Sequence, residues 1–91
     1  MTLLDPDEVE RRRSQLDGWS VDGKTIVKEF SCGDFAGSVE FVNRLTPLAE
    51  EMNHHPDLEI SWSTVTVTIS THSEGGLTGA DFELAGRIDA L

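Results

Sequence analysis

Several residue types are scarce in this sequence, and each shortage excludes a class of protein. Its 91 residues include one cysteine, Cys32, so no disulfide can form within the chain. A lone thiol suits a reducing compartment, and we expect a cytoplasmic protein. No apolar run is long enough to cross a membrane, and the first residues lack the charged and apolar segments of a signal peptide, so no membrane partner is expected.

Basic residues are also scarce. Seven lysines and arginines stand against 17 aspartates and glutamates, which gives a formal net charge of −10 at pH 7. Phosphate contacts need clustered cations, and the one basic cluster, residues 11–13, lies among acidic residues. That cluster is typical of a solvated helix face, so no nucleic-acid partner is expected.

The length suits a single domain, residues 1–91, with a small core. A first helix is predicted over residues 4–16. Asp5 is a favourable N-cap, Pro6 suits the first helical position, and Glu8 is placed to complete a capping box.

A β-hairpin is predicted over residues 19–30. Its turn is assigned to Asp22-Gly23, because both positions of a tight hairpin turn need positive φ. The pattern does not decide which face of the second strand is buried, that of Ile26 or that of Val27.

A long second helix is predicted to begin after Asp34. Apolar residues recur there every three or four positions: Phe35, Val39, Val42, Leu45, Leu48 and Met52. Pro47 should either kink this helix or divide it, with Thr46 as a second cap. The helix should stop at His55, because Pro56 disfavours helical geometry in the residue before it.

Two alternating strands follow, and then a last helix. The apolar positions of the strands are Leu58, Ile60 and Trp62, then Val65, Val67 and Ile69. Ser63-Thr64 is the expected turn between them, and Thr78 with Asp81 predicts a capping box for the helix. The predicted fold is α+β, a four-stranded antiparallel sheet with three helices on one face, in the order α-β-β-α-β-β-α.

Three histidines stand where predicted elements end. His54 and His55 close the long helix, and His72 follows the fourth strand. Terminal histidines often only cap a helix. If both elements end at one edge, however, the three imidazoles and Asp81 would line one cleft suited to proton transfer, with Glu50 placed to orient His54.

Metal binding is the rival interpretation, because three histidines and an aspartate could hold zinc with an open position. The HExxH spacing is absent, and adjacent residues such as His54 and His55 point about 100° apart on a helix. Acid–base chemistry is therefore the favoured reading.

The spacing of these residues resembles the signature of the pterin-4a-carbinolamine dehydratase family. The resemblance covers nearly the whole chain. It rests on Glu50, His54-His55-Pro56, Trp62, Thr71-His72, Gly75-Gly76-Leu77 and Asp81, with Gly18-Trp19 and Asp34-Phe35 further upstream.

The resemblance implies dehydration of 4a-hydroxytetrahydropterin to quinonoid dihydropterin and water, which recycles the pterin cofactor of aromatic amino-acid hydroxylases. The implied catalytic residues are His54, His55, His72 and Asp81, and the expected substrate-binding residues are Glu50, Trp62, Ser73 and Glu74. It implies no metal and no cofactor, and assembly as a homodimer or homotetramer. The alternative is a catalytically inactive binding or assembly module on the same fold.

Overall fold

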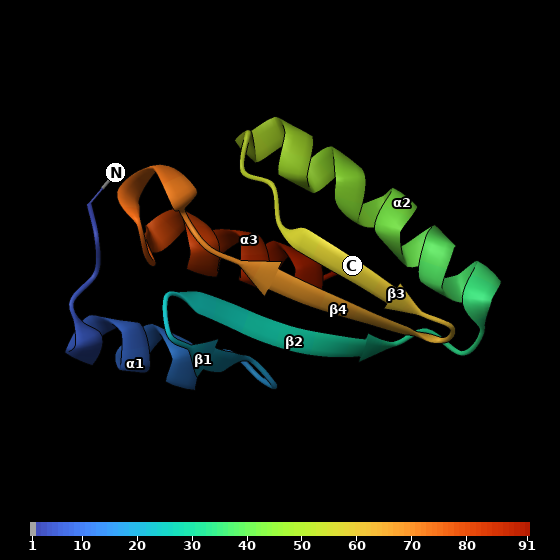
Figure 1. Ribbon diagram of the computed structural model, residues 1–91, viewed down its shortest axis with the longest axis horizontal. Coiled ribbons are helices and arrows are strands. Elements are labelled where there is room, and N and C mark those ends of the chain that lie inside the picture. Colours follow the sequence, from blue (N-terminus) through green and yellow to red (C-terminus); the bar gives the residue numbers. More distant parts are fainter. Residues whose placement is uncertain (1) are drawn as a thin grey trace.

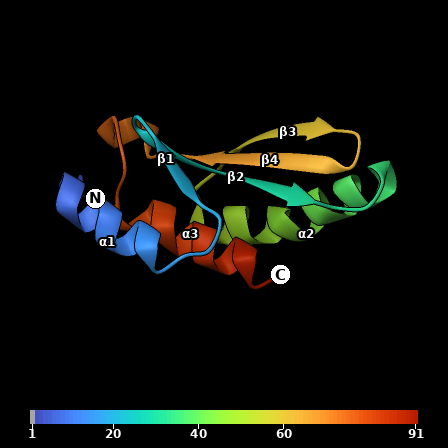
Figure 2. The same cartoon turned by 90° about the horizontal axis from the view of Figure 1, so that it is seen from below.

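Four antiparallel strands form one sheet, and three helices cover one of its faces (Figures 1 and 2). The computed structural model describes residues 2–91. The elements are α1 (Pro6–Ser14), β1 (Ser20–Asp22), β2 (Thr25–Ser31), α2 (Phe35–Met52), β3 (Asp57–Ser61), β4 (Thr64–Ile69), the 3-10 turn η1 (His72–Glu74) and α3 (Gly79–Asp89). The sheet order is β1-β2-β4-β3. The predicted fold class and order of elements are confirmed.

Strand β4 lies inside the sheet and supplies the centre of the core. Val65, Val67 and Ile69 are fully buried toward the helices, while the threonines between them face the other side. In β2 the residues paired with these three are Phe30, Lys28 and Ile26, so theirs is the buried face that the sequence pattern left open.

Lys28 is a charged residue on the core-facing side of β2, and its ammonium group is satisfied at the end of α3. Its Nζ lies 2.9 Å from Asp89 Oδ1 and 2.7 Å from the carbonyl oxygen of Asp17. The indole Nε1 of buried Trp19 donates to the same aspartate, at 2.9 Å. These bonds fasten the C-terminal end of α3 to the first hairpin.

Helix α2 runs unbroken through Pro47 from end to end. The hydroxyl of Thr46 bonds back to the carbonyl oxygen of Val42 at 2.8 Å, so Thr46 does not begin a second helix. The buried apolar residues of α2 are Phe41, Leu45 and Ala49. Phe35 and Val39, which belong to the predicted apolar stripe, are exposed.

Both hairpin turns lie one residue away from the predicted position. Asp22 pairs with Thr25, so the first turn is Gly23-Lys24, with Gly23 at φ 60°. Ser61 pairs with Thr64, so the second turn is Trp62-Ser63 and not Ser63-Thr64. Trp62 has φ 51°, which bulky residues rarely adopt, so propensity gave no reason to place it in a turn.

The first helix is shorter than predicted and its cap differs in part. Asp5 accepts a hydrogen bond from the backbone N–H of Glu8 at 2.8 Å, as expected for an N-cap. The Glu8 carboxylate turns away from that cap and accepts from Arg11 and Arg12 instead. Across residues 2–91, no helix has the length and apolarity needed to cross a membrane.

Candidate active site

The C-terminal end of α2 turns His54 back toward the core. Asn53 takes up the left-handed conformation, with φ 49°, and its N–H bonds to the carbonyl oxygen of Glu50 at 3.1 Å. The N–H of His54 bonds to the carbonyl oxygen of Ala49 at 3.0 Å, which completes a Schellman motif. The helix therefore ends at Met52, before the predicted stop at His55, and His54 is only 8% exposed.

His54 is bound to a fully buried carboxylate. Its Nε2 lies 2.6 Å from Oδ1 of Asp81, which is 0% exposed. Asp81 is the third residue of α3, and its other oxygen accepts the backbone N–H of Thr78 at 2.7 Å as part of the predicted capping box. One carboxylate thus caps α3 and anchors the histidine that follows α2.

Two buried threonines complete this network. The hydroxyl of Thr71 donates to Asp81 Oδ2 at 2.8 Å, and it lies 2.9 Å from the hydroxyl of Thr78. Thr71 follows β4 and pairs across a bridge with Gly76, so the strand end and the start of α3 share the carboxylate. The sequence reading did not assign these hydroxyls to the site, although the capping box already placed Thr78 beside Asp81.

His55 has a different setting from its neighbour. Its side chain is 56% exposed, and its Nε2 lies 2.8 Å from Oε2 of Glu50, whose side chain is 67% exposed. The prediction that Glu50 orients His54 is therefore wrong, because Glu50 pairs with His55. The Schellman turn separates the two rings, so one is anchored inside and the other is presented to solvent.

His72 lies in η1, the short turn that leaves β4 at the same end of the sheet as the last turn of α2 (Figure 1). His72 and Ser73 are exposed and Glu74 is partly exposed. His72 follows Thr71 directly, and Thr71 bonds Asp81, so the backbone beside His72 is fixed to the His54 network. Both elements end at the same end of the sheet, as predicted, while a single cleft lined by all three histidines stays a prediction.

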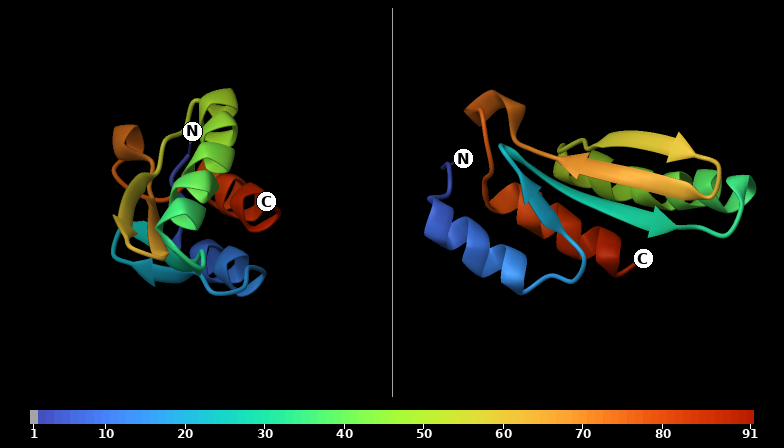
Figure 3. Two further views of the ribbon diagram at one scale, coloured as in Figure 1. Left: turned by 90° about the vertical axis from the view of Figure 1, so that its right-hand side faces the viewer. Right: turned by 60° about the horizontal axis from the view of Figure 1, so that its bottom comes forward.

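Trp62 does not join this group. The turn between β3 and β4 lies at the opposite end of the sheet (Figure 1 and the right-hand view of Figure 3). The backbone carbonyl of Trp62 accepts from the hydroxyl of Ser38, near the N-terminal end of α2, at 2.6 Å. Within one protomer, Trp62 therefore lies apart from the end that carries the histidines, and its side chain is 71% exposed.

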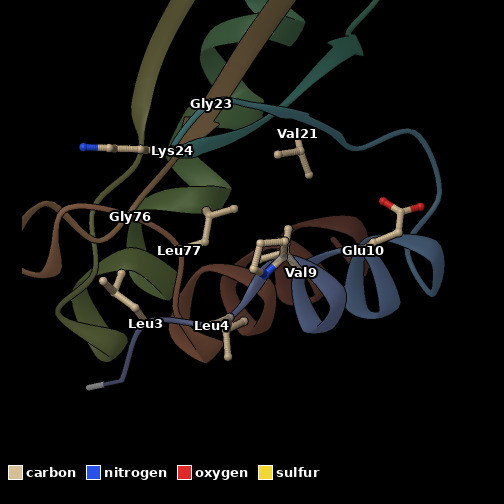
Figure 4. Close-up of a pocket in the computed structure, with 10 residues that line it drawn as sticks. Leu3, Leu4, Val9, Glu10, Val21, Gly23, Lys24, Gly76 and Leu77 are labelled. Carbon is tan, nitrogen blue, oxygen red and sulfur yellow. The ribbon is translucent and has the colours of Figure 1, made fainter.

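An apolar cavity of about 370 Å³ lies between the N-terminal segment, α1 and the β1–β2 turn (Figure 4). Its apolar lining is Leu3, Leu4, Pro6, Val9, Val21 and Leu77, and none of the candidate site residues lines it. The side chain of Lys24, at its rim, points away from these apolar groups. The cavity therefore gives no support to the histidine site.

The site supplies imidazoles in two settings, one anchored and two open to solvent. Imidazole can give and take protons near neutrality, and a buried carboxylate can fix which nitrogen of the anchored ring carries the proton. Among residues 2–91, no three histidine, cysteine or acidic side chains are grouped so that they could share a metal ion.

A family model and several known proteins match nearly the whole chain. A family model described as pterin 4 alpha carbinolamine dehydratase matches residues 2–91. A protein of Sulfolobus acidocaldarius is 46% identical over 88 residues, 97% of each chain. One of Roseiflexus castenholzii is 45% identical over 89 residues, 98% of this chain and 96% of the other. Both carry pterin-4-alpha-carbinolamine dehydratase as a provisional name.

Two solved structures are also similar. A transcriptional coactivator/pterin dehydratase of Brucella melitensis has a TM-score of 0.92 at 34% identity, covering 98% of this chain and 97% of that one. A pterin dehydratase-like protein identified as a RuBisCO assembly factor in the alpha-carboxysome has a TM-score of 0.67 at 29% identity, covering 80% of this chain and 87% of that one. The chain described here belongs to the pterin-4a-carbinolamine dehydratase family.

Proposed function

We propose that this protein dehydrates 4a-hydroxytetrahydropterin to quinonoid dihydropterin and water, and so recycles the pterin cofactor of aromatic amino-acid hydroxylases. The observation that carries the proposal is the 2.6 Å bond between His54 and buried Asp81, at the end of the sheet where His72 also lies. Membership of the family supports the same reaction.

The reaction needs an acid at the departing 4a-hydroxyl and a base at the ring N5–H, with no covalent intermediate. His54 and His72 act on these two protons. His55, held by Glu50, binds the pterin from the solvent side. Ser73 and Glu74 offer backbone groups to the amide edge of the pterin, because η1 brings them to the same end of the sheet.

The test is dehydration of freshly generated 4a-hydroxytetrahydropterin, followed by ultraviolet absorbance. We expect turnover above the spontaneous rate in the wild type, unchanged by a chelator, and a loss of roughly 100-fold in His72→Gln. His72 is exposed, so its substitution should leave the fold intact. Lys24→Gln, an exposed change at the β1–β2 turn, is the matched control and should keep wild-type turnover.

The second candidate is a binding or assembly module without activity. It is favoured by one observation, the similarity to a pterin dehydratase-like protein identified as a RuBisCO assembly factor. A folded wild type with no turnover above the spontaneous rate would select this function. Turnover that the chelator abolishes would contradict the metal-free mechanism.

We also propose that the working form is a homodimer or homotetramer in the cytoplasm. Every residue of β3 is exposed, and Leu58 and Ile60 remain 37% and 39% exposed although they share the helix-facing side of the sheet with Val67 and Val65. A bare edge strand with apolar side chains is a ready site for a second copy. The single thiol of Cys32 suits a reducing compartment.

A further inference from the structure

The hydrogen bonds around Asp81 end on its carboxylate. The single hydroxyl proton of Thr71 is given to Asp81 Oδ2, at 2.8 Å. The hydroxyl of Thr71 lies 2.9 Å from that of Thr78, which accepts from backbone N–H groups at the start of α3, including that of Ala80 at 3.3 Å. The two threonines therefore fix the carboxylate between the end of β4 and the start of α3.

These donors make Oδ2 of Asp81 an acceptor. Oδ2 receives the Thr71 hydroxyl and the backbone N–H of Thr78, which can only donate. The position of Asp81 in the first turn of α3 adds the favourable field of the helix N-terminus for an anion. An ionised carboxylate can only accept hydrogen bonds, so the proton between Oδ1 and His54 Nε2 belongs to the ring.

The second ring nitrogen of His54 faces outward. The ring bonds through Nε2, and Nδ1 has no partner among residues 2–91. Among residues 2–91, however, every side-chain nitrogen or oxygen that is wholly buried has a hydrogen bond, so a ring nitrogen without a partner must reach the surface. Nδ1 therefore accounts for part of the 8% of His54 that reaches the surface.

We propose that Thr71 and Thr78 are positioning residues that act through Asp81 to hold His54 with its proton on Nε2, so that His54 exchanges a proton with the substrate at Nδ1. The proposal deepens the dehydratase function and rests on it for the kinetic part. The state of the ring can be measured without any turnover.

The direct test is the ¹⁵N chemical shift of the ring nitrogens in protein labelled at histidine, at about pH 8.5, where histidines are ordinarily neutral. Only three histidines are present, and the exposed His55 and His72 can be assigned by His55→Gln and His72→Gln. We expect His54 to be protonated on Nε2 and bare on Nδ1. A wild-type ring protonated on Nδ1 would overturn the proposal.

Substitutions test whether the hydrogen bonds to Asp81 control the ring of His54. In Asp81→Asn, the side-chain carbonyl accepts the hydrogen bonds from the Thr71 hydroxyl and the Thr78 N–H. The amide N–H₂ then faces His54 and donates to Nε2, so the ring proton of His54 should move to Nδ1. Thr71→Val keeps the shape and removes one donor to the carboxylate. We expect the carboxylate, no longer fixed by this donor, to hold the His54 ring less firmly, which should change the ring signals of His54 and lower kcat roughly tenfold or more, with KM much less affected.

Thr71→Ser restores the hydroxyl and should restore both the ring shifts and kcat. The matched control is Thr68→Val, the same change on the helix-free face of β4, which should alter neither. If Thr71→Val kept wild-type shifts and kcat, the hydroxyl would have no positioning role. A correctly protonated His54 in a protein without turnover would refute the dehydratase function and leave the tautomer assignment standing.

Discussion

His54 and His55 are chemically identical neighbours whose stability effects should differ sharply. His54 is anchored to a carboxylate of zero exposure, so His54→Ala leaves that charge with one donor fewer. We expect the free energy of unfolding to fall by about 1.5–3 kcal/mol, as for the loss of a hydrogen bond to a buried charged group. His55→Ala, in an exposed pair, should change it by less than about 1 kcal/mol. Equal losses in chemical denaturation would show that Asp81 does not depend on His54.

At this scale, the sequence predicts residue types better than partners. The three histidines and Asp81 were selected by spacing, and His54 and Asp81 meet. Spacing also suggested that Glu50, four residues before His54, would reach it. The left-handed Asn53 rotates the chain beyond the helix, so the partner of Glu50 is His55. The sequence does not show which asparagine will take up the left-handed conformation, and this explains the wrong partner for Glu50.

Helix α2 lacks one backbone hydrogen bond at Pro47. Pro47 lies in its interior, lacks an N–H for the carbonyl of Asn43, and is exposed. Pro47→Ala should restore the hydrogen bond. We expect the free energy of unfolding to rise by about 1–2 kcal/mol, since the helical gain is offset in part by a more flexible unfolded chain. Thermal unfolding at matched concentration would measure it.

No rise in stability would mean that the helix is already adapted to the missing bond. Leu45→Ala is the opposite control in the same helix. Leu45 is 1% exposed, so its truncation should cost about 2–5 kcal/mol.

Helix α1 gives a pH-dependent prediction. Hydrogen bonds from Arg11 and Arg12 to the Glu8 carboxylate lower the pKa of Glu8 to about 2. Because the pKa is lowered on folding, the associated stability is present above the ordinary value of 4.5 and is lost as pH falls through about 2. Carboxyl ¹³C shifts should show this titration.

Arginine substitutions separate the two acidic residues of α1. Arg12→Gln should raise the pKa of Glu8, while Arg13→Gln should raise that of Glu10, whose pKa the Arg13 hydrogen bond lowers. If the pKa of Glu8 stayed unchanged in Arg12→Gln, Arg12 would not contribute to the lowered pKa of Glu8. These arginine–glutamate pairs lie on the surface of α1, so they inform local charge rather than global stability.

Elements were predictable because their signals are local. Alternation identified β4, and Thr78 with Asp81 identified the start of α3. Both hairpin turns were misplaced by one residue, because register is set by cross-strand pairing that one sequence does not display. Phe35 and Val39 fit the helical period of α2 but remain 57% and 38% exposed.

On the scale of the whole molecule, the two edges of the sheet are unequal. β1 is three residues long, and β3 is a five-residue strand with no covered residue. Apolar side chains accompany β3: Leu58, Ile60, Trp62 in the following turn, and Phe35 and Val39 on the neighbouring α2. Trp62 is remote from the histidines of its own chain, so its exposure is better explained by a contact between copies than by substrate binding.

Ile60→Lys tests this edge, because it places a charge where a second copy would bury an isoleucine. We expect sedimentation to show the wild type as a dimer or tetramer and Ile60→Lys as a monomer. Val21→Lys is the matched control, since Val21 lies on the other edge strand and is also 39% exposed. It should leave the assembly intact.

Two copies would each bring a net charge of −10, so salt should tighten the wild-type assembly by screening their repulsion. A monomeric wild type at every salt concentration would remove the case for β3 as an interface.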